Sequence, residues 1–95
     1  MAKVVKYRPK EVNVWFRGVE YVGDMVRCRR ALVARQVEGA LDSMESLANA
    51  VGISRSTVSR FFSGRQTSLS VTLRILEQLH LTFEDVYTLV LEQAV

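Results

Sequence analysis

The pattern of hydrophobic and polar positions changes about a quarter of the way along the chain. In the first part the two kinds of residue alternate, because Val12, Val14 and Phe16 would lie on one side of an extended strand. Gly18 interrupts the alternation, which then resumes for a few residues. Alternation with a period of two predicts a short strand or a hairpin. The basic segment 3–10 before it is expected to form an arm.

The rest of the chain predicts five helices, because short polar residues able to cap a helix stand before five apolar stretches. These caps are Asp24, Ser43, Ser54, Ser68 and Thr82. We expect the first helix to end near Leu41, and Gly52 and Gly64 to end the second and third. The predicted fold class is therefore all-α, a five-helix bundle preceded by a short basic arm or β-element.

Apolar residues at helical spacing predict the buried side of three of these helices. They are Val33, Val37, Ala40 and Leu41 on the first helix, Leu69, Leu73, Leu76 and Leu79 on the fourth, and Val86, Leu89 and Val90 on the fifth. The fifth helix also begins with Thr82-Phe83-Glu84-Asp85, which resembles a capping box with aspartate in the acidic position.

Composition limits the class of protein. The chain has 95 residues, of which 48% are hydrophobic and one is proline, as is typical of one compact domain. Its single cysteine, Cys28, cannot form an internal disulfide, which fits a reducing compartment. No apolar stretch approaches the ~20 residues that a membrane helix needs. We therefore expect a cytoplasmic protein.

The net charge of +3 is distributed unevenly along the chain. The first 23 residues hold five basic and two acidic residues, whereas residues 67–95 hold one basic and four acidic residues. Positive charge therefore gathers in the first two thirds. This asymmetry favours contact of one face with a polyanion.

Residues 44–63 have the pattern of two short helices that cross at a steep angle. Such a crossing needs a small residue where the helices meet, which is Ala48, and a turn residue that accepts positive φ, which is Gly52. Apolar residues must fill the angle between the helices, and these are Leu47, Val51, Ile53, Val58 and Phe61. All seven positions are suitably occupied, which predicts a helix-turn-helix.

The second of these two helices has an outer side suited to the major groove of DNA. Its outward residues are small or basic and include no acid: Arg55, Ser56, Ser59, Arg60 and Ser63. Small side chains allow close approach to base edges, and arginine can pair with guanine O6 and N7 through two hydrogen bonds. We therefore expect this side of the helix to enter the major groove, with its N-terminal residues near the base edges.

The same segment and the run after it resemble the lambda-repressor/Cro superfamily, also called the XRE family of helix-turn-helix regulators. The resemblance covers residues 28–92. It rests on Ser43, Leu47-Ala48, Val51-Gly52-Ile53-Ser54, Thr57-Val58, Phe61, Ser63-Gly64-Arg65 and the run SLSVTLRILEQLHLTFEDV. That run separates the chain from the LacI-type family, in which a different third helix and a hinge follow.

The resemblance implies a transcriptional regulator, more often a repressor, that binds double-stranded DNA as a homodimer on a palindromic operator. It implies base contacts from the third helix, by Arg55, Ser56, Ser59 and Arg60. It also implies phosphate contacts near both ends of that helix, by Ser54, Thr57, Ser63 and Arg65. Phage and small bacterial regulators have this size. Such a protein would be associated with the nucleoid when bound to DNA.

Some features depart from the family's pattern. Met44 stands where many members have a glutamine that touches a phosphate, and the link over residues 39–43 is slightly longer than usual. The first 23 residues match nothing typical of the family. We therefore divide the chain into residues 1–23, a basic arm with a possible short strand or hairpin, and residues 24–95, the DNA-binding domain.

The role of the first 23 residues leaves alternatives open. The arm could contact DNA or only increase solubility, through Lys3, Lys6, Arg8 and Lys10. Trp15, Phe16 and Tyr21 could form a dimer contact or a wing, or they could pack against the bundle. The alternative function is an antitoxin or another protein-interaction module, which would bind a partner protein through residues 12–21.

Catalysis and metal binding are not expected. One histidine and one cysteine cannot supply a catalytic triad or a zinc site, and the dispersed glycines form no phosphate-binding loop. We therefore expect no enzyme activity, no cofactor and no metal. Cys28 is expected to be a packing residue, because a redox role would require a lowered pKa.

Overall fold

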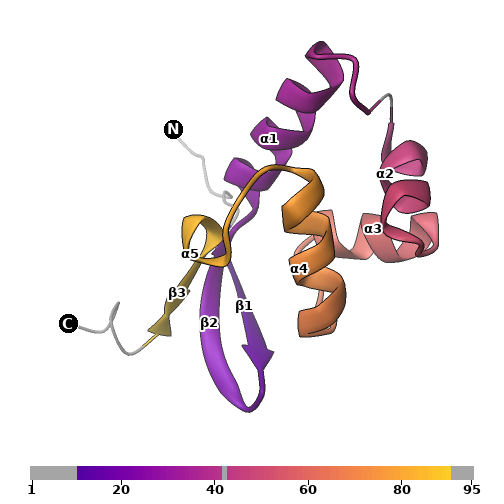
Figure 1. Cartoon of the computed structure of the whole chain (residues 1–95). Coiled ribbons are helices and arrows are strands. Elements are labelled where there is room, and N and C mark those ends of the chain that lie inside the picture. The colour runs from indigo at the N-terminus through magenta and orange to yellow at the C-terminus, as the bar shows by residue number, and fades with distance from the viewer. Residues whose placement is uncertain (1–10, 42, 91–95) are drawn as a thin grey trace, which may run out of the picture.

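The computed structural model describes residues 11–41 and 43–90. The elements follow one another as β1 (Glu11–Phe16), β2 (Val19–Asp24), α1 (Met25–Val37), α2 (Met44–Val51), α3 (Arg55–Phe62), α4 (Leu69–Gln78), α5 (Phe83–Val86) and β3 (Tyr87–Leu89). In Figure 1 the sheet and α5 lie on one side, α2 and α3 lie on the other, and α4 stands between them. No helix in the described ranges is long and apolar enough to cross a membrane.

The three strands form an antiparallel sheet in the order β1-β2-β3. Phe16 pairs with Val19, and the two residues between them have φ of 55° and 75°, as in the type I′ turns of tight hairpins. The other edge of β2 pairs with β3, from Tyr21–Leu89 to Gly23–Tyr87. The sheet therefore joins both ends of the described chain.

One hydrophobic core connects the sheet to the helices. Its buried members come from every element except β2, and from the residues just before α2 and just after α4: Val14, Phe16, Met25, Cys28, Leu32, Leu41, Leu47, Ala48, Val51, Val58, Phe61, Phe62, Ile75, Leu76, Leu79, Val86 and Tyr87. Four rings from the hairpin, α5 and β3 contact one another with centroids 4.8–6.0 Å apart, and these are Phe16, Tyr21, Phe83 and Tyr87. Phe16 and Tyr21 thus pack against the helices, whereas Trp15 is 52% exposed on the opposite face of the sheet.

The predicted hairpin and all five predicted helix starts are confirmed. In each case the side chain of the predicted cap accepts a hydrogen bond from a backbone N–H three residues on, at 3.1–3.2 Å. The capping box of α5 is present, since the Asp85 carboxylate also accepts a hydrogen bond from the Thr82 N–H. These starts are local in sequence, which is why a single chain is enough to predict them.

The all-α class is only partly right, because three strands accompany the five helices. The predicted fifth helix is a single turn, and the chain becomes extended at Tyr87, with φ of −113° and ψ of 134°. Leu89 therefore lies in β3, where it pairs with Tyr21, and not on the apolar side of a helix. Hydrogen bonds to β2 satisfy the backbone N–H and C=O groups of this segment, which further helical turns would otherwise do.

Two predicted helix faces are also wrong in part. α1 ends at Val37, because Gly39 has a φ of 81° in the left-handed region, and the chain reaches Leu41 as a loop. Val33 and Val37 are 56% and 82% exposed, Ala40 is also exposed, and the buried side of α1 is formed by Met25, Cys28 and Leu32.

On α4, Leu73 is 45% exposed and Leu69 is half-buried, whereas Thr72, Ile75 and Leu76 are buried. The Thr72 hydroxyl shares a 2.8 Å hydrogen bond with that of Thr67, so a polar side chain occupies a core position.

Candidate nucleic-acid interface

The corner between α2 and α3 is built around Gly52. Its φ of 83° lies in the left-handed region, and its N–H donates to the Ala48 carbonyl at 2.8 Å. The Ile53 N–H donates to the same carbonyl at 3.0 Å. These bonds satisfy the end of α2 while the chain turns, so that α3 can begin three residues later. Ala48 is 2% exposed, as the steep crossing requires.

The inner side of α3 is held by the core. Val58, Phe61 and Phe62 are buried, with at most 2% of each residue exposed, and the rings of the two phenylalanines meet edge to face at 5.1 Å. Leu47 and Val51 of α2 are also buried, and Ile53 in the turn is half-buried. All the residues predicted to fill the angle between the helices therefore lie there, at least half-buried. The orientation of α3 is fixed by this packing.

The outer side of α3 carries the four predicted base-contacting residues. Arg55, Ser56, Ser59 and Arg60 are all exposed. The ion pairs of the described residues are Arg27 with Asp85 at 3.6 Å and Arg35 with Glu38 at 2.7 Å, so neither arginine of α3 is neutralised by an acidic side chain there. The exposed side of α3 is therefore a positively charged, hydrogen-bonding surface on a rigid helix.

The predicted phosphate-contacting residues lie at the two ends of α3. Ser54 caps the helix, and its hydroxyl also lies 2.8 Å from that of Thr57 and 3.0 Å from that of Ser56. At the other end the Ser63 hydroxyl donates to the Arg60 carbonyl at 3.0 Å, and Arg65 is exposed. Polar groups therefore stand near both ends of α3.

The loop after α3 is fastened to the hairpin, a feature that the sequence did not reveal. The Gln66 side chain accepts a hydrogen bond from the Trp15 N–H at 2.8 Å and donates to the Trp15 carbonyl at 2.7 Å. The amide group thus imitates a neighbouring strand along the free edge of β1. Val12 of the same strand packs directly against Gly64. No local pattern predicts these contacts, because Trp15 and Gln66 are 51 residues apart in sequence.

Other predictions near the interface have mixed outcomes. Met44, at the family's glutamine position, is half-buried against the core, and α2 is capped by Ser43 instead. Cys28 is fully buried, and desolvation raises the pKa of its thiol to about 12, which fits a packing residue. The predicted arm residues Lys3, Lys6, Arg8 and Lys10 lie outside the described residues.

Comparison with known proteins supports the assignment of the central helices. No curated protein and no solved structure matches the chain. Residues 40–86, about half of the chain, match a family described as helix-turn-helix. The match contains α2, the turn at Gly52, α3, α4 and α5. The chain therefore belongs, by its match over residues 40–86, to the lambda-repressor/Cro-type (XRE) family of helix-turn-helix DNA-binding regulators.

Proposed function

We propose that the chain is a sequence-specific transcriptional repressor that binds a palindromic operator as a homodimer. In each half-site the outer side of α3 enters the major groove. Base edges are contacted by Arg55, Ser56, Ser59 and Arg60, and phosphates by Ser54, Thr57, Ser63 and Arg65. Occupancy of the operator excludes RNA polymerase by steric overlap.

The observation that carries this proposal is the chemistry of the exposed side of α3. Two arginines without acidic partners among the described residues stand beside two serines, on a helix whose opposite side is buried. The serines allow the helix backbone to approach the floor of the groove, and each arginine can make two hydrogen bonds to guanine. An acidic residue on this side would repel phosphate, and α3 contains none.

The basic arm is proposed to add a sequence-independent contact. Its four basic residues would follow the phosphate backbone or the minor groove beside the half-site. Deletion of residues 1–10 should then weaken binding to all duplexes while the unfolding transition stays in place. An unchanged affinity would leave the arm without a role in DNA binding.

Selection from a random duplex library tests the function directly. The full chain should enrich one motif with two inverted half-sites, and a spacing of about one helical turn, ~10 base pairs, would place both copies of α3 on one side of the duplex. A motif without symmetry would contradict the homodimer, and no enrichment would contradict sequence-specific binding.

A second function, binding of a partner protein by an antitoxin or related module, is favoured by the hairpin. Trp15 is 52% exposed on the outer face of the sheet, where a large aromatic side chain is a frequent anchor of protein interfaces. If the chain acts by binding a partner protein, Trp15→Ser should abolish its activity in the cell. Arg55→Ala and Arg60→Ala should then leave that activity intact. The opposite result would assign the activity to α3.

A further inference from the structure

Arg29 connects α1 to the end of the DNA-facing helix. The residue lies on α1, outside the residues that match the helix-turn-helix family. Its Nη2 donates a 3.0 Å hydrogen bond to the carbonyl of Phe62, the last residue of α3. Arg29 remains exposed, and this bond uses one of the five N–H donors of a guanidinium group.

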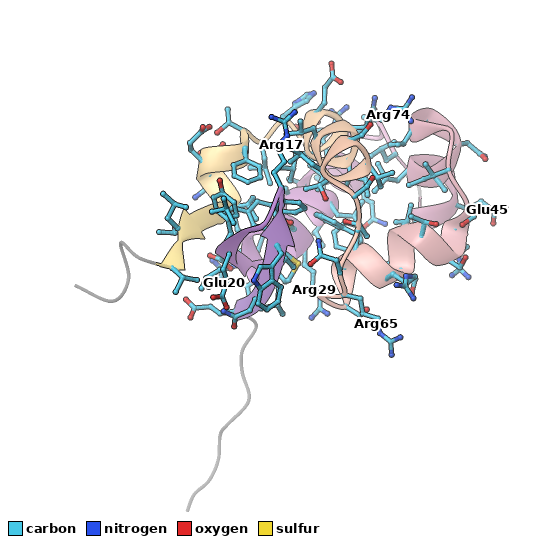
Figure 2. The ribbon with its side chains drawn as sticks, turned by 90° about the horizontal axis from the view of Figure 1, so that it is seen from below. Arg17, Glu20, Arg29, Glu45, Arg65 and Arg74 are labelled. Carbon is cyan, nitrogen blue, oxygen red and sulfur yellow. The ribbon has the colours of Figure 1, made fainter. Side chains whose placement is uncertain are left out.

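The charge of Arg29 has no acidic partner in the part of the chain that the structure describes. The two ion pairs there are formed by Arg27 and Arg35. Figure 2 shows Arg29 and Arg65 emerging on one side of the molecule, whereas Arg17 and Arg74 emerge on the opposite side. Two guanidinium groups thus face the same way near the C-terminal end of α3.

This placement changes the electrostatics of the helix end. The unpaired carbonyl groups at the C-terminus of a helix carry partial negative charge, which repels phosphate. Arg29 satisfies one of these carbonyl groups and adds a full positive charge beside it. The bond to Phe62 also holds the guanidinium in place, so less side-chain entropy is lost when an anion binds.

We propose that Arg29 is a DNA phosphate contact, which extends the interface from α3 and its following loop to α1. The inference rests on the proposed function, because it requires a duplex at the exposed side of α3. The phosphate bound by Arg29 would lie beyond the C-terminal end of α3, close to the phosphate bound by Arg65. Because Arg29 is also bonded to Phe62, its phosphate contact fixes the depth of α3 in the groove. A contact to phosphate carries no base preference of its own.

The dependence of affinity on salt tests this inference. Binding of the full chain to a labelled random-sequence duplex is measured from about 50 mM to about 200 mM KCl, with the wild type and Arg29→Gln. Each lost phosphate contact lowers the slope of log K against log salt by ~0.9 per protomer. The affinity deficit of Arg29→Gln should therefore shrink about threefold for one bound protomer over this range, and about tenfold for a bound homodimer. Arg74→Gln removes the same charge on the opposite side and should keep the wild-type slope.

A purely structural role for Arg29 gives a different result. If Arg29 only caps α3, Arg29→Gln lowers the unfolding midpoint but keeps the wild-type slope, and the inference is wrong. Arg29→Lys retains a point charge and should keep the slope. Should Arg29→Gln fail to fold, the wild-type protein is modified with an arginine-specific dicarbonyl in the presence and absence of the duplex. Bound DNA should protect Arg29 from modification and leave Arg74 reactive. Equal modification of Arg29 with and without DNA overturns the inference.

These outcomes are separable from failure of the proposed function. If the wild-type chain shows no salt-dependent binding to any duplex, the DNA-binding function itself is contradicted. If the wild type binds and Arg55→Ala weakens that binding, but Arg29→Gln does not change the slope, only the role of Arg29 is contradicted.

Discussion

Replacement of Gly64 by alanine tests whether the N-terminal hairpin is packed against the loop that follows α3. Gly64 has a φ of +86°, and a Cβ built there would clash with Cγ1 of Val12 and lie 3.2 Å from its Cβ. Gly52 supplies a matched control, because its φ is +83° but a Cβ there meets nothing within 4 Å. The two substitutions share the cost of a left-handed backbone and differ in the contact with Val12.

The magnitudes follow from these two geometries. A side chain in the left-handed region costs about 1–2 kcal/mol of unfolding free energy, so Gly52→Ala should lose about that amount. Gly64→Ala adds the cost of overpacking, about 1–3 kcal/mol, because β1 or the loop must shift to admit the methyl group. The expected loss for Gly64→Ala is therefore about 2–5 kcal/mol.

Urea denaturation of the full chain, followed by far-UV circular dichroism, measures both losses. A double-mutant cycle with Val12→Ala isolates the contact, because removal of Cγ1 makes room for the new methyl group. We expect the loss for the double variant to be about 1–3 kcal/mol smaller than the sum of the two single losses. Equal losses for Gly64→Ala and Gly52→Ala, with no coupling to Val12, would refute the packing of the hairpin on this loop.

The remaining predictions concern pH, association and capping. Burial raises the pKa of the Cys28 thiol from 9.0 to about 12. The native state therefore keeps a proton that the unfolded chain loses, and the unfolding free energy should fall as pH rises from about 9 toward about 12, by up to ~1.4 kcal/mol per pH unit. Urea titrations at pH ~8 and ~10.5 should show this fall, and Cys28→Ala should reduce it; an equal fall in both proteins would contradict the assignment. Val37 is 82% exposed on α1, so if a second copy packs there, Val37→Glu should weaken dimerisation about tenfold or more in sedimentation experiments. An unchanged dimerisation constant would exclude this surface. Ser54→Ala removes the cap of α3 and should cost about 1 kcal/mol in thermal unfolding, whereas Ser56→Ala should cost less than half of that.

Features that depend on residues close together in the chain could be predicted from the sequence alone. Helix caps such as Ser43 and Ser54 bond to backbone groups three residues away, and the turn at Gly52 is set by a left-handed backbone conformation. The outer side of α3 follows from the burial of Val58, Phe61 and Phe62, because the two phenylalanines lie three and four residues after Val58. Each of these constraints acts within one or two helical turns, so it can be inferred from a single chain.

The features that the sequence did not predict depend on residues far apart along the chain. The segment from Tyr87 is apolar and could continue a helix, but pairing with β2 makes it a strand. The apolar residues Val33 and Val37 predicted a buried side for α1, although the rest of the protein covers the side that carries Cys28. The contact between Gln66 and Trp15 likewise depends on how β1 is placed against the loop. Tertiary packing decides such cases, and local periodicity carries no information about it.

The central claim is that the exposed side of α3 reads base sequence, and the affinities of Arg55→Ala on two duplexes test it most directly. One duplex carries the motif selected by the wild-type chain, and the other has a scrambled sequence of the same length and composition. We predict a loss of about 5- to 150-fold on the selected duplex, equivalent to ~1–3 kcal/mol, and a much smaller loss on the scrambled one. Equal losses on both duplexes, or no loss on either, would contradict base recognition by α3.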